Sequence, residues 1–229
     1  MGHNQTQVLD DVTVPLRSPA MVASLERMGS SFPSCLSFMR ALVRRLHSEA
    51  WSVRPSCIEL DDQGYGYMVY TARGPERNYS LVGFSNALSD NQRTDRVIAT
   101  AWDASFVLFD GEPNKEDIDR LRISTPKQEA GRFEATELVL ARANRSVRLF
   151  EHVCEALANG RQPDTRLISD IGYLMRTTAV YGNGKFGVAD RSRIEERTEL
   201  TSPFQAEMLT LYMIRMFTTD LVEHIAQRR

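Results

Sequence analysis

The sequence contains few of the residues that build disulfide frameworks and metal sites. Three cysteines and four histidines occur among its 229 residues. Cys35, Cys57 and Cys154 lie far apart and match neither a CxxC motif nor a zinc-ligand spacing. The histidines form no HExxH motif. An odd number of cysteines without a secretory signal predicts free thiols in a reducing, cytoplasmic compartment. We expect no metal site, and the pattern identifies no cofactor.

Long apolar runs and a strong excess of charge are also missing. No apolar run approaches the ~20 residues that cross a bilayer, so we expect no membrane partner. The formal net charge is −2, whereas dedicated nucleic-acid-binding domains are usually clearly basic, so we expect no nucleic-acid partner. The hydrophobic fraction of 42% is ordinary for a globular protein. A chain of this length can bury a core without disulfides or metals.

The sequence predicts one domain preceded by a flexible arm. Residues 1–17 are polar and aperiodic, which is typical of a mobile terminus. Residues 18–229 are expected to form a single α+β domain, with helices across 18–48. The second of these helices should begin near Pro33 and run to about His47.

Between residues 51 and 110 the period of the pattern changes from helical to strand-like. Asp61-Asp62-Gln63-Gly64 is typical of a hairpin turn. Short β-rich runs joined by tight turns need no crossover helices, which favours an antiparallel meander of four to five strands packed against several helices. The expected strands are 56–60, 67–71, 79–84, 96–101 and 105–109.

Residues 114–229 are expected to be helical. Asn114 can cap a short helix, and a long helix is predicted over 136–159. Asp164 can cap a further helix that includes Met175. Ser202-Pro203 begins the final helix, with the cap and the first-turn proline that such starts favour.

Three arginines recur every third residue within the predicted helix 136–159. Arg142, Arg145 and Arg148 would form a basic stripe on its surface. Glutamates lie nearby, so we interpret the stripe as an exposed, salt-bridged face, with an anion site as the alternative.

The final helix is apolar on most of its sides and rich in methionine over 203–227. Such a helix is either buried centrally or meets a partner, which favours a homo-oligomer or a further protein segment. The apolar pattern continues to Arg229 without a stop signal. We therefore expect that the chain is the front part of a larger protein or assembly.

The glycine-rich loop 176–193 is the segment with the densest polar chemistry. Its glycines Gly182, Gly184 and Gly187 satisfy GxGxxG, but they follow an expected helix and precede no strand with a VAIK-like lysine. A dinucleotide site would need a preceding strand and a following helix. The motif therefore predicts neither a kinase nor a Rossmann site.

Two interpretations of this loop remain. The glycines can simply allow a sharp helix exit. Alternatively, the loop recognises a small anion, because arginine offers a planar fork to carboxylate or phosphate groups and lysine offers a point charge. Lys185 and Asp190 are then the candidate catalytic residues for acid–base work. The candidate substrate-binding residues are Arg176, Thr178, Tyr181, Asn183 and Arg191.

Two long segments carry a resemblance. GYLMRTTAVYGNGKFGVADR and SPFQAEMLTLYMIRMFTTDLVEHIA are similar to the N-terminal region of longer, functionally uncharacterised bacterial proteins. The resemblance covers most of the chain after about Ser34. It implies that relatives continue beyond the final helix, and it transfers no activity and no catalytic residue.

The residues favour a cytoplasmic bacterial protein that binds, and as an enzyme would act on, a small anionic metabolite through loop 176–193. The alternative is a non-catalytic interaction or regulatory domain that uses the methionine-rich final helix as its partner surface. The first hypothesis requires Arg176, Lys185 and Arg191 to line one pocket. The second requires an exposed apolar stripe along Met208–Ile225.

Overall fold

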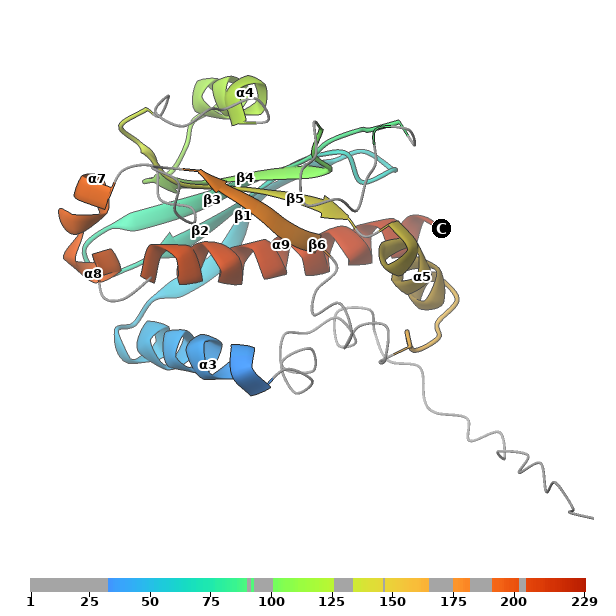
Figure 1. The fold of residues 1–229 in the computed structure, drawn as a ribbon, viewed down its shortest axis with the longest axis horizontal. Helices are drawn as coiled ribbons and strands as arrows, with labels where there is room; N and C mark the ends of the chain where they lie inside the picture. Colours follow the sequence, from blue (N-terminus) through green and yellow to red (C-terminus); the bar gives the residue numbers. More distant parts are fainter. Residues whose placement is uncertain are drawn as a thin grey trace, which may run out of the picture.

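An antiparallel sheet of six strands lies at the centre of the described part of the chain (Figure 1). The computed structural model describes residues 33–89, 92, 101–125, 134–145, 147–164, 175–181, 191–201 and 205–229. The strands follow one another across the sheet in sequence order, and each pairs antiparallel with the next. This meander confirms the predicted α+β class. The strands are β1 Ser52–Leu60, β2 Gly66–Arg73, β3 Asn78–Ser85, β4 Ala104–Asp110, β5 Glu137–Arg145 and β6 Met175–Tyr181.

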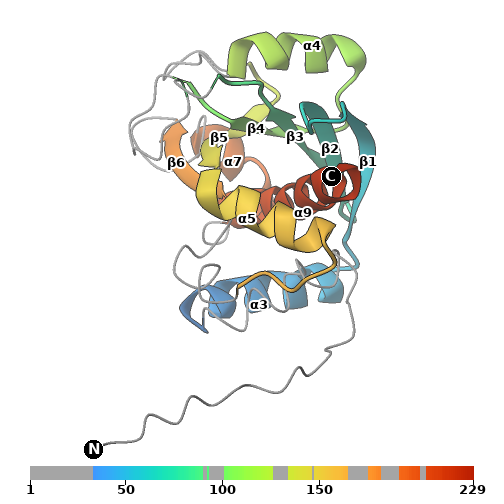
Figure 2. The ribbon, with the colours of Figure 1, turned by 90° about the vertical axis from the view of Figure 1, so that its right-hand side faces the viewer.

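Helices cover both faces of the sheet. Figures 1 and 2 show α4 on one face, α5 and α9 on the other, and α3 beneath α9. Side chains alternate between the two cores along β2 and β4, as the pleat requires. In β2, Met68 and Tyr70 face α9, whereas Tyr67 and Val69 lie in the cluster with α4. The helices are α3 Pro33–Ser48, α4 Lys115–Ser124, α5 Val147–Ala158, α7 Arg191–Glu195, α8 Thr198–Thr201 and α9 Gln205–Arg228.

Several local predictions are confirmed. Residues 61–65 connect β1 and β2, and Gly64 donates to the Asp61 carbonyl at 2.9 Å. Asn114 caps α4, where its side chain and that of Asp117 each accept the other residue's backbone N–H, which is a capping box. Helix α3 covers the predicted range from Pro33 to His47.

Helix α9 is the centre of the larger core. It packs on β2, β3, β4 and β5 and contacts α3, α5 and α8. Phe217 is fully buried and makes an edge-to-face contact with Phe106 at 5.0 Å. In the described residues, none of the exposed large apolar side chains (Val43, Ile58 and Ile123) lies on α9. Most apolar side chains of the helix are therefore buried, while Met208, Leu211, Tyr212 and Met216 are half-buried. Its use as a partner surface stays a prediction.

The predicted helix 136–159 is wrong in its first half. Residues 137–145 form β5, and only Val147–Ala158 are helical. The apolar run of β5 is buried on both faces of the sheet, with Val139 and Ala141 toward α9 and Leu140 toward α4. Such a run lacks the apolar–polar alternation of a half-exposed strand and resembles a buried helix. The helical region 114–229 therefore also contributes two strands.

The arginine stripe is wrong for the same reason. Arg142 and Arg145 are three residues apart on a strand, so they lie on opposite faces of the sheet. Arg142 contacts the end of α4, whereas Arg145 contacts Phe150 of α5. Both arginines are buried, so the exposed salt-bridged face is wrong too.

Other predictions fall partly or wholly outside the described residues. Met175 begins strand β6 and is not helical, while residues 165–174 are not described. The arm 1–17, the first helix, and all of strand 96–101 except Ala101 also lie outside. The final helix is confirmed from Gln205, and its predicted start at Ser202-Pro203 is outside.

Candidate functional site

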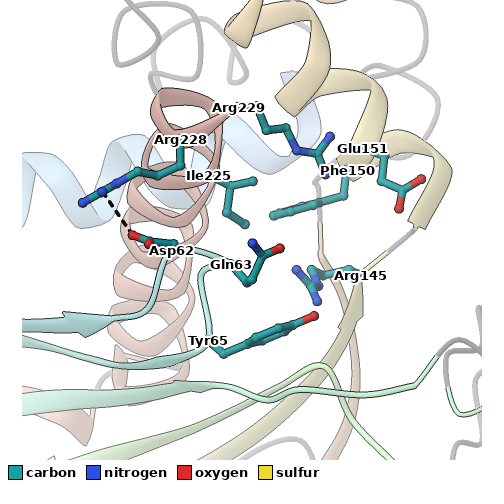
Figure 3. A pocket seen from close by; sticks show the side chains of 9 residues that line it. All are labelled: Asp62, Gln63, Tyr65, Arg145, Phe150, Glu151, Ile225, Arg228 and Arg229. Atoms are coloured by element: carbon teal, nitrogen blue, oxygen red, sulfur yellow. Dashed lines mark ion pairs between the residues drawn. The ribbon is translucent and has the colours of Figure 1, made fainter.

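A pocket of about 170 Å³ opens where four elements end (Figure 3). The β1–β2 turn, the end of β5, the first turns of α5 and the end of α9 meet there. An engineered cavity of about 150 Å³ accepts benzene, so the volume fits a ligand about the size of a small amino acid or organic acid. The lining residues are Asp62, Gln63, Tyr65, Arg145, Phe150, Glu151, Ile225, Arg228 and Arg229.

The β1–β2 turn forms one wall of the pocket and is fixed from within. The Asp61 carboxylate accepts the backbone N–H groups of Gln63 and Tyr65, both at 2.9 Å. This is the local bonding that makes aspartate a turn residue. Gly64 has a φ of 79°, and a Cβ there would lie 2.7 Å from the side chain of Ile225. Only glycine allows both this backbone conformation and such close approach of the turn to α9.

Two polar contacts hold the turn against the last turns of α9. The ring nitrogen Nε2 of His224 lies 2.7 Å from the Asp61 carbonyl oxygen. Arg228 forms an ion pair with Asp62 at 3.1 Å, which Figure 3 marks. The end of α9 is therefore both a structural support for the turn and a second wall of the pocket.

Arg145 is the buried cation of the pocket. Its side chain is 7% exposed, and its Nη2 lies 3.5 Å from Oδ1 of Asp103, which is itself 1% exposed. The backbone N–H of Arg145 donates to the other oxygen of Asp103 at 2.9 Å. The guanidinium carbon is 4.9 Å from the Phe150 ring centre and 5.8 Å from that of Tyr65. These contacts are within the range of cation–π attraction and fix the orientation of the guanidinium.

A buried thiol lies behind the pocket. Cys154 follows Phe150 by one turn of α5 and is fully buried. Burial raises the pKa of Cys154 to about 11, although the positive charges of Arg229 and Arg145 oppose this rise. A thiol that stays protonated at neutral pH is a poor nucleophile. Cys154 therefore contributes packing to the site and no reactive group.

A second polar cluster lies on the opposite face of the sheet, at the end of α4. The Nε of Arg142 donates to the Thr125 carbonyl at 3.2 Å, and the guanidinium lies 5.9 Å from the Trp102 ring. The buried hydroxyls of Ser105, Ser124 and Thr125 find no hydrogen-bond partner in the described structure. A cation at a helix C-terminus is a favourable cap. This cluster is therefore explained as a structural junction, unlike the open pocket at Arg145.

Two tyrosine–carboxylate pairs connect the sheet to the helices. Tyr70 donates to Asp220 of α9 at 2.6 Å, and Tyr79 donates to Glu199 of α8. Burial raises the pKa of Asp220, and the hydrogen bond from Tyr70 partly offsets that rise. Each pair satisfies a buried phenol where the helical layer meets the strands, so both pairs are interpreted as structural.

The structure places only part of the predicted loop site. The candidate catalytic residues Lys185 and Asp190, and the candidate ligand Asn183, lie outside the described residues. Their roles stay predictions.

The remaining predicted residues are spread along one strand and the helix that follows it. Arg176, Thr178 and Tyr181 belong to β6, and Arg191 begins α7. Arg176 pairs with Asn144, next to Arg145, whereas Tyr181 pairs with Leu140 at the other end of the strand. Five residues of strand span about 17 Å. Asn144 precedes Arg145 on the strand, so this pairing position belongs to the face opposite to Arg145. None of the predicted site residues is among the described residues that line the pocket, and the two ends of the predicted set are far apart.

Sequence reasoning missed the residues that form this pocket. The predicted arginine stripe includes Arg145 but gives it an exposed position and no part in a pocket. A strand assignment for 137–145 would have placed Arg145 at a strand end, where ligand-contacting side chains commonly lie. The contributions of Phe150 and Arg228 depend on helix packing, for which the sequence offered no signal.

Metal and membrane sites were also examined in the described part of the chain. No group of three or more His, Cys, Asp or Glu side chains there is arranged to hold a metal ion. None of the helices in that part combines the length and the apolar character that a bilayer crossing needs.

Comparisons with protein-family models, with curated proteins and with solved structures found no match. The resemblance to longer bacterial proteins therefore stays a prediction, and the function must be argued from the pocket.

Proposed function

We propose that the protein binds a small anionic metabolite, with a carboxylate or phosphate group, in the pocket around Arg145. The observation that carries this proposal is a buried arginine that lines an open pocket and is held in one orientation by Asp103, Tyr65 and Phe150. A planar guanidinium presents two parallel N–H donors, which match a carboxylate or phosphate edge. Because the orientation is already fixed, ligand binding loses little side-chain entropy.

The charges and the apolar surfaces around Arg145 support the same ligand class. Arg229 adds positive charge at the end of α9, whereas Arg228 is paired with Asp62. Phe150 and Ile225 supply an apolar surface for the body of the ligand. The lining as a whole is mostly polar, so these two side chains form a small apolar surface beside the charged groups.

A thermal-shift screen of the full chain against carboxylated and phosphorylated metabolites tests the proposal. At ten times its Kd a ligand stabilises the native state by about 1.4 kcal/mol. For a chain of this size that corresponds to a rise of about 3–6 °C in Tm. Arg145→Lys keeps the positive charge beside Asp103 but loses the planar fork, so the shift should shrink. Arg73→Lys is the matched control, because Arg73 is an exposed arginine that pairs with Glu112 away from the pocket.

Three results would contradict the proposal or its location. No shift with any compound would contradict anion binding. A shift that Arg145→Lys leaves intact would place the ligand elsewhere. A shift that Lys185→Ala and Arg191→Ala abolish, but Arg145→Lys does not, would return the site to the glycine-rich loop.

A further inference from the structure

The charges that line the pocket are paired in a way that restricts the ligand further. Arg228 is neutralised by Asp62 at 3.1 Å, and Arg145 has Asp103 behind it at 3.5 Å. The remaining charged residues of the lining are Arg229, which is positive, and Glu151, which is negative. Neither makes an ion pair within the described part of the chain. The pocket therefore presents one cation and one anion whose charges are not already compensated.

Three of these charges lie close to one another. Arg145, Arg229 and Glu151 all act electrostatically on the buried thiol of Cys154. Figure 3 shows the Arg145 guanidinium between Tyr65 and Phe150, with Glu151 to one side on α5 and Arg229 on the side of Phe150 away from Tyr65. Cations and a carboxylate thus border the same small space.

A balanced set of charges disfavours a multiply charged anion. A phosphate dianion or a dicarboxylate would bring two negative charges near the exposed carboxylate of Glu151 and the buried carboxylate of Asp103, and like charges at short distance repel one another. A ligand with one negative and one positive group meets no such repulsion. Its carboxylate can face the Arg145 fork and the uncompensated charge of Arg229, and its ammonium can face Glu151.

From these contacts we infer that the ligand is a zwitterion of the amino-acid class, with a small apolar side chain. This inference rests on the proposed function, because it names the ligand of the same pocket. Phe150 and Ile225 supply the apolar surface against which the side chain packs. The volume of about 170 Å³ accommodates a compact side chain.

The test starts from a thermal-shift screen of the full chain with the standard apolar L-amino acids, beside acetate and inorganic phosphate. The strongest amino acid is then titrated by calorimetry against two analogues, the acid that lacks its amino group and the amine that lacks its carboxylate. Hydrogen bonds to charged groups typically change affinity by about tenfold or more, so we expect the amino acid to bind at least about tenfold tighter than either analogue.

Glu151→Gln removes the negative charge and keeps the shape of the side chain. We expect it to abolish the preference for the amino acid over the deaminated acid. Because it removes a negative charge beside the pocket, it should not weaken the binding of that acid. Glu155→Gln is the matched control, because Glu155 is exposed one turn further along α5 and does not line the pocket.

The failures of the two proposals are distinguishable. If acetate, phosphate or the deaminated acid binds as well as any amino acid, the zwitterion inference is overturned and anion binding stands. The inference is also overturned if Glu151→Gln leaves the preference intact. If no amino acid and no anion binds a folded sample, the proposed function fails with it.

Discussion

Replacing Arg145 with methionine should destabilise the protein, because it leaves the carboxylate of Asp103 buried without its guanidinium partner. Asp103 is 1% exposed and Arg145 is 7% exposed. Removing one member of a buried ion pair typically costs about 3–5 kcal/mol. Asp103 still accepts the backbone N–H of residue 145, so we expect a value near the lower end of that range.

Replacing the other member of the pair, Asp103, should reduce stability less. Asp103→Asn leaves Arg145 charged, but Arg145 lines an open pocket, where water can reach its guanidinium. We expect a loss of about 1–3 kcal/mol, which is typical of a broken hydrogen bond to a charged group. In the double variant neither charge is buried alone. Its loss should therefore be smaller than the sum of the single losses by about 1 kcal/mol or more.

Urea unfolding followed by tryptophan fluorescence measures these values, because Trp51 and Trp102 report on opposite faces of the sheet. Arg145→Lys serves as the charge-conserving control. If Arg145→Met costs less than about 1 kcal/mol, or if the two single losses simply add, Asp103 and Arg145 do not form the coupled pair on which the site depends.

Three further predictions concern the rest of the fold. Gly83→Ala should cost about 1–3 kcal/mol in urea unfolding, because the new Cβ would lie 2.6 Å from the ring of Phe217; a neutral result would mean that this core is looser than described. Burial raises the pKa of Asp220 above its ordinary value of 3.8, so its stabilising effect is present below that pH and is lost as the pH rises through the folded-state pKa. The unfolding free energy of Asp220→Asn relative to the parent chain should therefore increase with pH across that window, and a flat difference would contradict the raised pKa. Ser80→Ala should cost about 1 kcal/mol, because its hydroxyl donates to the Gly111 carbonyl, whereas Ser105→Ala removes a hydroxyl without a partner in the described structure and should cost less; equal losses would indicate a buried water at Ser105.

The parts of the fold that the sequence predicted are those with strong local signals. The Asp61–Gly64 turn and the Asn114 cap depend on side chains that bond to their own backbone. Such signals do not depend on the rest of the molecule. The meander over 51–110 followed from the turns that separate its strands.

The second half of the sheet could not be predicted in this way. Strand β5 is covered on both faces, so its pattern resembles that of a buried helix, and α5 begins only two residues after it ends. Strand β6 pairs with β5. Because residues 137–145 were assigned to a helix, β6 had no expected partner strand, and neither strand was predicted. The pocket could not be predicted for the same reason, because Arg145 is the last residue of β5.

The candidate pocket differs in location from the predicted site. An arginine fork for a small anion was expected in loop 176–193, and that site stays a prediction, because the described residues that line the pocket include none from this loop. The pocket itself forms where α9 meets the β1–β2 turn, more than 150 residues apart in sequence, a packing arrangement that local patterns do not encode.

The most direct test of the central claim is a titration followed by the ¹H–¹⁵N resonances of the arginine side-chain Nε–H groups. The resonance of Arg145 is assigned by its loss in Arg145→Lys, and that of Arg73 serves as the internal control. With the strongest ligand of the screen, we predict that the Arg145 signal shifts and saturates at the ligand's Kd while the Arg73 signal stays constant. A saturable shift in the backbone signals of Asn183 and Lys185, with Arg145 unmoved, would contradict the pocket and assign binding to the glycine-rich loop.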